Sequence, residues 1–77
     1  MTQEEVRTLK VGDLVTWTDP ATCSQTIEIV TSNDCEPKII HVQLRTIAVL
    51  CDPENEHDIG EEGWIHNYNC VCMEKIA

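Results

Sequence analysis

The chain has 77 residues, which is enough for one small domain and too short for two. Fourteen acidic residues stand against five basic ones, and this excess disfavours direct binding of DNA or RNA, because Lys and Arg are needed to neutralise phosphates. The formal net charge of −9 would instead attract a basic partner protein or a cation. A chain of this length forms only a small hydrophobic core, so we expect a free energy of unfolding of roughly 3–5 kcal/mol before any stabilising cross-link or partner is counted.

The cysteines and the first residues bear on the cellular compartment. Met1–Lys10 contains no apolar signal segment, and no stretch of the chain reaches the roughly 18 apolar residues that a membrane span needs. Five cysteines, an odd number, do not fit a fully paired disulfide framework. The sequence therefore predicts a cytoplasmic protein with reduced thiols and no membrane contact.

The start of the chain is expected to be a disordered or frayed leader. Residues 1–8 are mostly polar and offer little to bury, whereas a single small β-barrel domain is expected over residues 9–77. Gly12-Asp13 supplies a turn or bulge, and Asp19-Pro20 ends the first strand, because proline has no amide hydrogen for the ladder. The apolar residues of this segment share one parity, the period-2 pattern of a half-buried strand: Leu9, Val11, Val15 and Trp17.

Two further β segments follow. Gln25–Thr31 is predicted to be a strand in which Ile27 and Ile29 face one way and the residues between them face the other. Lys38–Cys51 has the strongest β signal in the chain, since it is rich in Ile, Val, Leu and Thr. Because fourteen residues exceed a usual strand, we expect a break near Gln43–Thr46, either as a hairpin or as a sharp bend.

The last third combines an acidic loop with two short strands. Asp52–Glu62 holds six acidic residues among eleven and no basic one, so the loop should stay solvated and mobile. Strands are expected at Gly63–His66 and Cys70–Ile76. Short strands separated by turn signals favour an all-β fold, a small, partly open barrel of about five antiparallel strands, which protects its edges by closure. The carboxylates are expected outside in water, and the interior is expected to form around Val15, Ile29, Val42 and Val71.

Two sequence patterns resemble a known family. Lys10–Val15, which reads K-V-G-D-L-V, is similar to the opening K-x-G-D-x-V of many small SH3-like barrels in bacteria and their phages. Gly63-Trp64, followed by a short turn and a last strand, also looks like that family. The resemblance implies a five-stranded, partly open barrel that binds proteins or nucleic acids and has no catalytic residues. The negative charge of this chain departs from the nucleic-acid-binding members.

Candidate binding residues are the aromatic side chains and the carboxylates of the acidic loop. The negative charge would steer a basic partner protein, and an apolar patch near the two tryptophans would hold it. An aromatic ring beside carboxylates also suits a Lys or Arg side chain. The predicted partner-binding residues are Trp17, Asp52, Glu54, Glu56, Asp58, Glu61, Glu62, Trp64 and Tyr68.

Two alternative functions stay open. A compact domain this acidic could imitate the phosphate backbone and occupy a DNA- or RNA-binding host protein, and phage-encoded inhibitors are similar in size and charge. If His66, Cys70 and Cys72 share one face of an extended strand, they could hold a structural zinc ion, with Cys51 or Cys35 as the fourth ligand. The Cys-x-x-Cys spacing that is typical of zinc sites is absent.

No catalytic centre is recognisable in the sequence. Cysteine and histidine are present, but no local signature marks a nucleophilic pair. The carboxylates lie in turns or in the acidic loop, where burial would not perturb their titration. We therefore predict a non-enzymatic binding module without a cofactor or a metal, and the sequence leaves open whether it forms a homo-oligomer.

Overall fold

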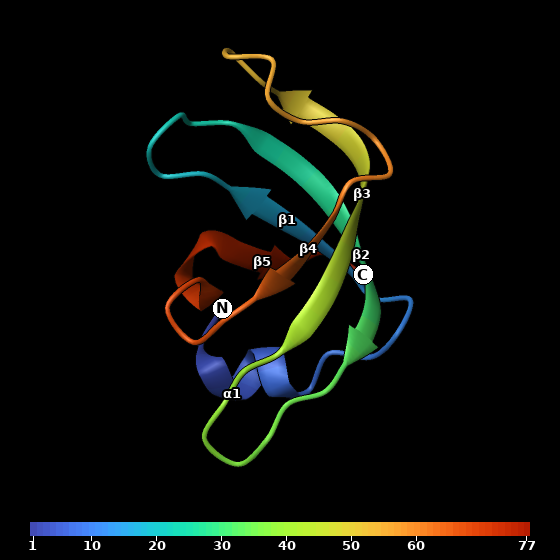
Figure 1. Cartoon of the computed structure of the whole chain (residues 1–77), viewed down its shortest axis with the longest axis vertical. Coiled ribbons are helices and arrows are strands. Elements are labelled where there is room, and N and C mark those ends of the chain that lie inside the picture. The colour runs from blue at the N-terminus through green and yellow to red at the C-terminus, as the bar shows by residue number, and fades with distance from the viewer.

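The computed structural model describes all 77 residues, and it is mainly β-structure (Figure 1). The strands form one antiparallel sheet in the order β4-β3-β2-β1-β5, in which β4 and β5 are the two free edges. The predicted all-β fold of about five antiparallel strands is confirmed, as one open sheet. The strands are β1 (Leu14–Thr18), β2 (Gln25–Asn33), β3 (Val42–Cys51), β4 (Glu62–Ile65) and β5 (Met73–Lys75).

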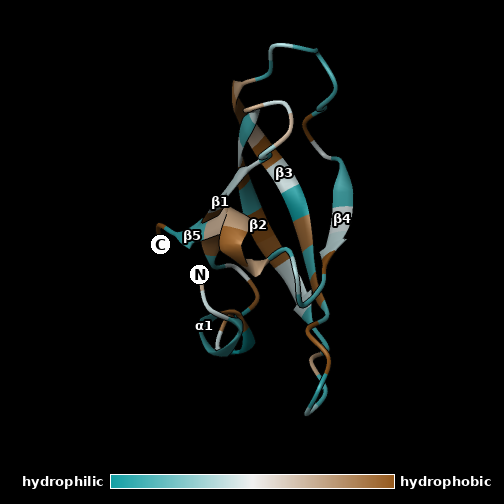
Figure 2. Ribbon diagram, turned by 90° about the vertical axis from the view of Figure 1, so that its left-hand side faces the viewer, coloured by the Kyte–Doolittle hydropathy of each residue, from teal (hydrophilic) through white to brown (hydrophobic).

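The two long central strands are bent. Register shifts between β2 and β3 leave an extra residue at Thr31 in β2 and at Ile47 and Leu50 in β3. Such bulges bend a strand and increase its local twist. Seen from the side, β5 and β1 lie on one side of the molecule and β4 on the other, with β2 and β3 between them (Figure 2). Strand β3 thus begins four residues after the predicted start at Lys38, and its irregularities lie at Ile47 and Leu50, beyond the break expected near Gln43–Thr46.

The first eight residues belong to the fold, and the prediction of a disordered or frayed leader over residues 1–8 is wrong. Helix α1 (Gln3–Arg7) begins with a capping box, in which the side chains of Thr2 and Glu5 each accept a hydrogen bond from the other residue's backbone amide. Val6 is fully buried, and the Met1 ammonium group donates to the main-chain carbonyls of Cys70 and of Met73, the first residue of β5. The helix lies at the lower end of the sheet (Figure 1).

The apolar core combines both ends of the chain with the sheet. Val15 and Val42 are buried, as predicted. Ile29 is only half-buried, because the inward parity of β2 is that of Val30. The buried apolar cluster consists of Val6, Leu9, Val15, Val30, Ile40, Val42, Leu44, Ile65, Cys70 and Met73.

The C-terminal segment differs from its predicted form. The sequence predicts one strand over Cys70–Ile76, whereas the structure has a 3₁₀ turn, η1 (Cys70–Cys72), followed by β5 (Met73–Lys75). A 3₁₀ turn does not alternate its side chains as a strand does. Val71, which was expected to face the interior, is consequently 82% exposed.

Asn33, the last residue of β2, connects the end of helix α1 to the sheet by hydrogen bonds. Its side-chain nitrogen donates to the carbonyls of Arg7 and Leu9, and its side-chain oxygen accepts from the Cys35 amide. We expect Asn33→Ala to lower the free energy of unfolding by about 1–3 kcal/mol, because three main-chain groups lose their partner together. Urea denaturation measures this loss. The control Ser32→Ala should stay within about 0.5 kcal/mol of the wild type, and an equal loss in both variants would contradict the assignment.

Candidate functional site

The inward-facing side chains of the sheet change from apolar to polar along the strands. Val30 of β2 and Leu44 of β3 pair with each other inside the apolar cluster. The next inward pair is Glu28 and Thr46, and both residues are buried. Thr26, the following inward residue of β2, is buried as well. A polar interior therefore begins where the apolar core ends.

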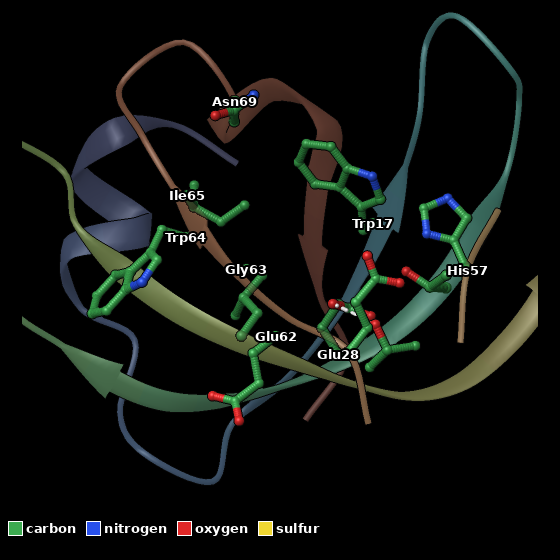
Figure 3. A pocket seen from close by; sticks show the side chains of 12 residues that line it. Trp17, Glu28, His57, Glu62, Gly63, Trp64, Ile65 and Asn69 are labelled. Carbon is green, nitrogen blue, oxygen red and sulfur yellow. Dashed lines mark hydrogen bonds between the residues drawn. The ribbon is translucent and has the colours of Figure 1, made fainter. Parts of the chain in front are cut away.

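A pocket of about 230 Å³ lies at this polar end of the interior (Figure 3). Strands β1 to β4 and the loop between β3 and β4 all contribute to its lining, which includes Trp17, Glu28 and His57. Figure 3 shows Trp17 and His57 on the Glu28 side of the pocket, whereas Glu62 and Trp64 lie on the opposite side. The pocket thus brings together side chains that are far apart in the sequence.

Glu28 is the only buried acidic residue, which corrects the expectation that all carboxylates stay outside in water. The residue is 9% exposed, and its Oε1 accepts a hydrogen bond of 3.1 Å from the Thr46 hydroxyl. Its Oε2 is buried without any partner. Burial raises the pKa of Glu28, the side chains of Thr46 and Thr26 and the His57 charge act against this rise, and repulsion from Glu61 adds to it. The carboxylate therefore retains an unused acceptor inside the protein.

His57 carries the second buried polar atom without a partner. Its Nε2 makes no hydrogen bond, while its backbone amide donates to the Asp52 carboxylate at 2.8 Å. Asp52 also accepts from the Glu56 amide at 3.1 Å, and these backbone hydrogen bonds lower the pKa of Asp52. Asp52 thus shapes the turn that brings His57 to the pocket.

The returning half of the acidic loop is attached to β3. The Gly60 amide donates to the Thr46 carbonyl at 2.7 Å, and the Thr46 amide donates to the Glu61 carbonyl at 2.9 Å. Gly60 has a φ of +92°, a left-handed backbone that favours glycine. The loop is therefore fastened beside the Glu28–Thr46 pair, although the sequence predicts a solvated and mobile segment. Most side chains of the acidic loop are exposed.

Four of the nine predicted partner-binding residues line the pocket, namely Trp17, Glu61, Glu62 and Trp64. Sequence reasoning missed Glu28, because Thr26, Glu28 and Val30 form the less apolar parity of β2. The Asn-Glu-His-Asp stretch of the loop likewise contains no signal that His57 turns inward. The predicted residues outside the pocket are Asp52, Glu54, Glu56, Asp58 and Tyr68.

The two tryptophans do not form a single patch. Trp64 stacks on His41 with ring centroids 3.8 Å apart, and His66 extends the stack towards Tyr68. Trp64 is 39% exposed and Tyr68 is 78% exposed, so this stack lies at the surface. Trp17 alone places an indole ring beside Glu28 (Figure 3).

The predicted zinc ligands are not arranged around a common point. The extended strand that would align His66, Cys70 and Cys72 is replaced by a turn and η1. The Cys70 thiol is buried and donates to the His66 carbonyl, with the sulfur 3.7 Å from the oxygen. No group of three or more His, Cys, Asp or Glu side chains is placed to hold a metal ion. This geometry gives the zinc hypothesis no support.

None of the helices has the length and apolar character that crossing a membrane would require. A scan against protein-family models, a search of curated proteins and a search of solved structures found no match to this chain.

Proposed function

We propose that this chain is a non-enzymatic module that binds a basic partner protein through its acidic surface. The observation that carries the proposal is that five of the six carboxylates of the acidic loop form no ion pair within the protein. Of the six acidic residues in Asp52–Glu62, only Glu62 forms an ion pair, with Arg45 at 3.1 Å. A hydrogen bond with Glu54 and repulsion from it raise the pKa of Glu56, as expected where carboxylates crowd together. A basic surface would relieve this crowding.

We also propose that the chain is a small SH3-like barrel, the family that its sequence resembles. The open five-stranded antiparallel sheet supports this assignment. So does the turn within Lys10–Val15, where Gly12, two residues before β1 begins, has a φ of +96°. Gly63 and Trp64 lie in β4, ahead of a short turn and the last strand. The resemblance implies a binding module, in agreement with the charge argument.

Neutralising the exposed tip of the acidic loop tests the proposed function. A variant with Glu54→Gln, Glu56→Gln and Asp58→Asn should associate with the captured basic partner roughly tenfold more slowly at low salt, because exposed charges mainly set the association rate. The partner is first isolated from a lysate of the source organism, and the rate is then measured by surface plasmon resonance. The difference between variant and wild type should shrink at high salt, as screening removes the steering.

The matched control removes the same number of charges elsewhere. Glu4→Gln, Asp34→Asn and Glu36→Gln are exposed positions outside the loop, and this triple variant should associate at nearly the wild-type rate. Equal slowing in both variants, or a partner whose binding ignores salt, would contradict the role of the loop. A partner that binds nucleic acid and is displaced by DNA or RNA would support the alternative of a nucleic-acid mimic.

A further inference from the structure

Both of the buried side-chain atoms that lack a hydrogen-bond partner line the same pocket. They are Oε2 of Glu28 and Nε2 of His57, and no other buried side-chain nitrogen or oxygen in the chain is unpartnered. Folded proteins satisfy nearly all of their buried polar groups, since an unpaired one costs about 1–3 kcal/mol. Two such atoms at one pocket indicate a site that a ligand completes.

The charges of the pocket define the ligand. Glu28, Glu61 and Glu62 contribute to its lining, and no lysine or arginine does. The unpartnered atom of Glu28 is an acceptor. An ammonium or guanidinium group consists only of donors and brings the opposite charge. The ligand group is therefore a cation.

The size and walls of the pocket suit a cation on an apolar stem. At about 230 Å³, the pocket admits one long side chain but no folded segment. The indole ring of Trp17 can lie against a stem or a cation, and Leu44 and Ile65 supply apolar wall. A bare metal ion would bind neither to the indole ring nor to this apolar wall.

We propose that this pocket binds the side chain of one lysine or arginine of the partner protein, whose cationic head donates to Oε2 of Glu28 while its stem lies beside Trp17. This inference rests on the proposed function and deepens it. The acidic loop steers the basic partner, and the pocket holds one of its side chains.

Side-chain analogues test the pocket without the partner. In a two-dimensional ¹H–¹⁵N spectrum, n-butylammonium or n-propylguanidinium should shift the Trp17 indole signal and the Thr46 amide signal saturably, at constant ionic strength. The ¹³C signal of the Glu28 carboxylate should move together with them. The neutral analogue n-butanol should not reproduce these shifts. Whichever cation saturates at the lower concentration identifies the preferred residue as lysine or arginine.

Two variants with the same charge change make the result specific. Glu28→Gln should weaken binding of the cation at least about tenfold, and its spectrum reports whether it is folded. Glu4→Gln, in helix α1 and outside both the pocket and the acidic loop, should bind like the wild type. Shifts that never saturate, or that persist in a folded Glu28→Gln protein, would overturn the inference. Should Glu28→Gln fail to fold, the Glu28 carboxylate signal of the wild type decides alone.

The two proposals fail separately. If the loop variant slows association with a basic partner while the analogues leave Trp17 unmoved, the proposed function stands and the pocket inference is refuted. If the analogues bind at Glu28 but no basic partner is captured, cation binding by the pocket stands, whereas the proposed function and the partner side chain as occupant are refuted.

Discussion

Val6→Asp is expected to unfold the protein at neutral pH. Val6 is fully buried within the apolar cluster, where an unpaired carboxylate costs several kcal/mol. A domain of this size has only roughly 3–5 kcal/mol to lose. The milder Val6→Ala should lower the free energy of unfolding by about 1–3 kcal/mol. Circular dichroism and the signal dispersion of the amide spectrum report unfolding, and urea denaturation measures the smaller loss.

Glu4→Ala provides the control on the same helix. Glu4 is exposed, so its removal should change the free energy of unfolding by less than about 0.5 kcal/mol. If Val6→Asp behaved like Glu4→Ala, residues 1–8 would be dispensable, as the sequence-based prediction of a frayed leader implies.

The strands were predictable from local patterns, whereas the helix was not. Alternating or β-branched residues mark β1, β2 and β3, and these patterns are independent of tertiary context. Helix α1 is only five residues long and buries one of them, so it has no helical periodicity. One signal was available, since Thr2 and Glu5 have the Ser/Thr-x-x-Glu spacing of a capping box.

The site was only partly predictable because it depends on strand register. Trp17 and the acidic loop are conspicuous in the sequence, but the inward face of β2 is set by its neighbours. Glu28 pairs with Val15 on one side and with Thr46 on the other, and both of these residues are buried. The more apolar parity of Ile27 consequently lies on the other face. No local pattern contains this pairing.

Glu28→Gln is expected to stabilise the protein at pH 7. Glutamine keeps an oxygen that accepts from the Thr46 hydroxyl, and it replaces a buried charge by a neutral amide, which costs less to bury. We expect a gain of about 1–3 kcal/mol, and each kcal/mol raises the melting temperature of a domain this size by roughly 4–8 °C. Urea denaturation and thermal unfolding, both followed by circular dichroism, measure the gain.

The pH dependence of this difference identifies its cause. Burial raises the pKa of Glu28 in the folded state, so the folded protein binds the proton more tightly than the unfolded chain does. The resulting stabilisation is complete below the unfolded-state pKa and is lost as the pH rises through the higher folded-state pKa. Lowering the pH from 7 towards 4 should therefore bring the wild type closer to the Glu28→Gln variant. Burial has the largest effect on this pKa, the side chains of Thr46 and Thr26 and the His57 charge lower it, and Glu61 raises it.

The exposed Glu74→Gln on β5 is the control, and its stability relative to the wild type should not follow this pH profile. A Glu28→Gln protein that is less stable than the wild type at pH 7 would mean that the carboxylate is satisfied internally, and the pocket would then need no cation. A Glu28→Gln protein that is more stable but no longer binds butylammonium would mean that the carboxylate is not satisfied internally and that the cation binds to it. Oε2 of Glu28 would then destabilise the free protein and bind the ligand, because the cation supplies the hydrogen-bond donor that the folded protein lacks at this atom.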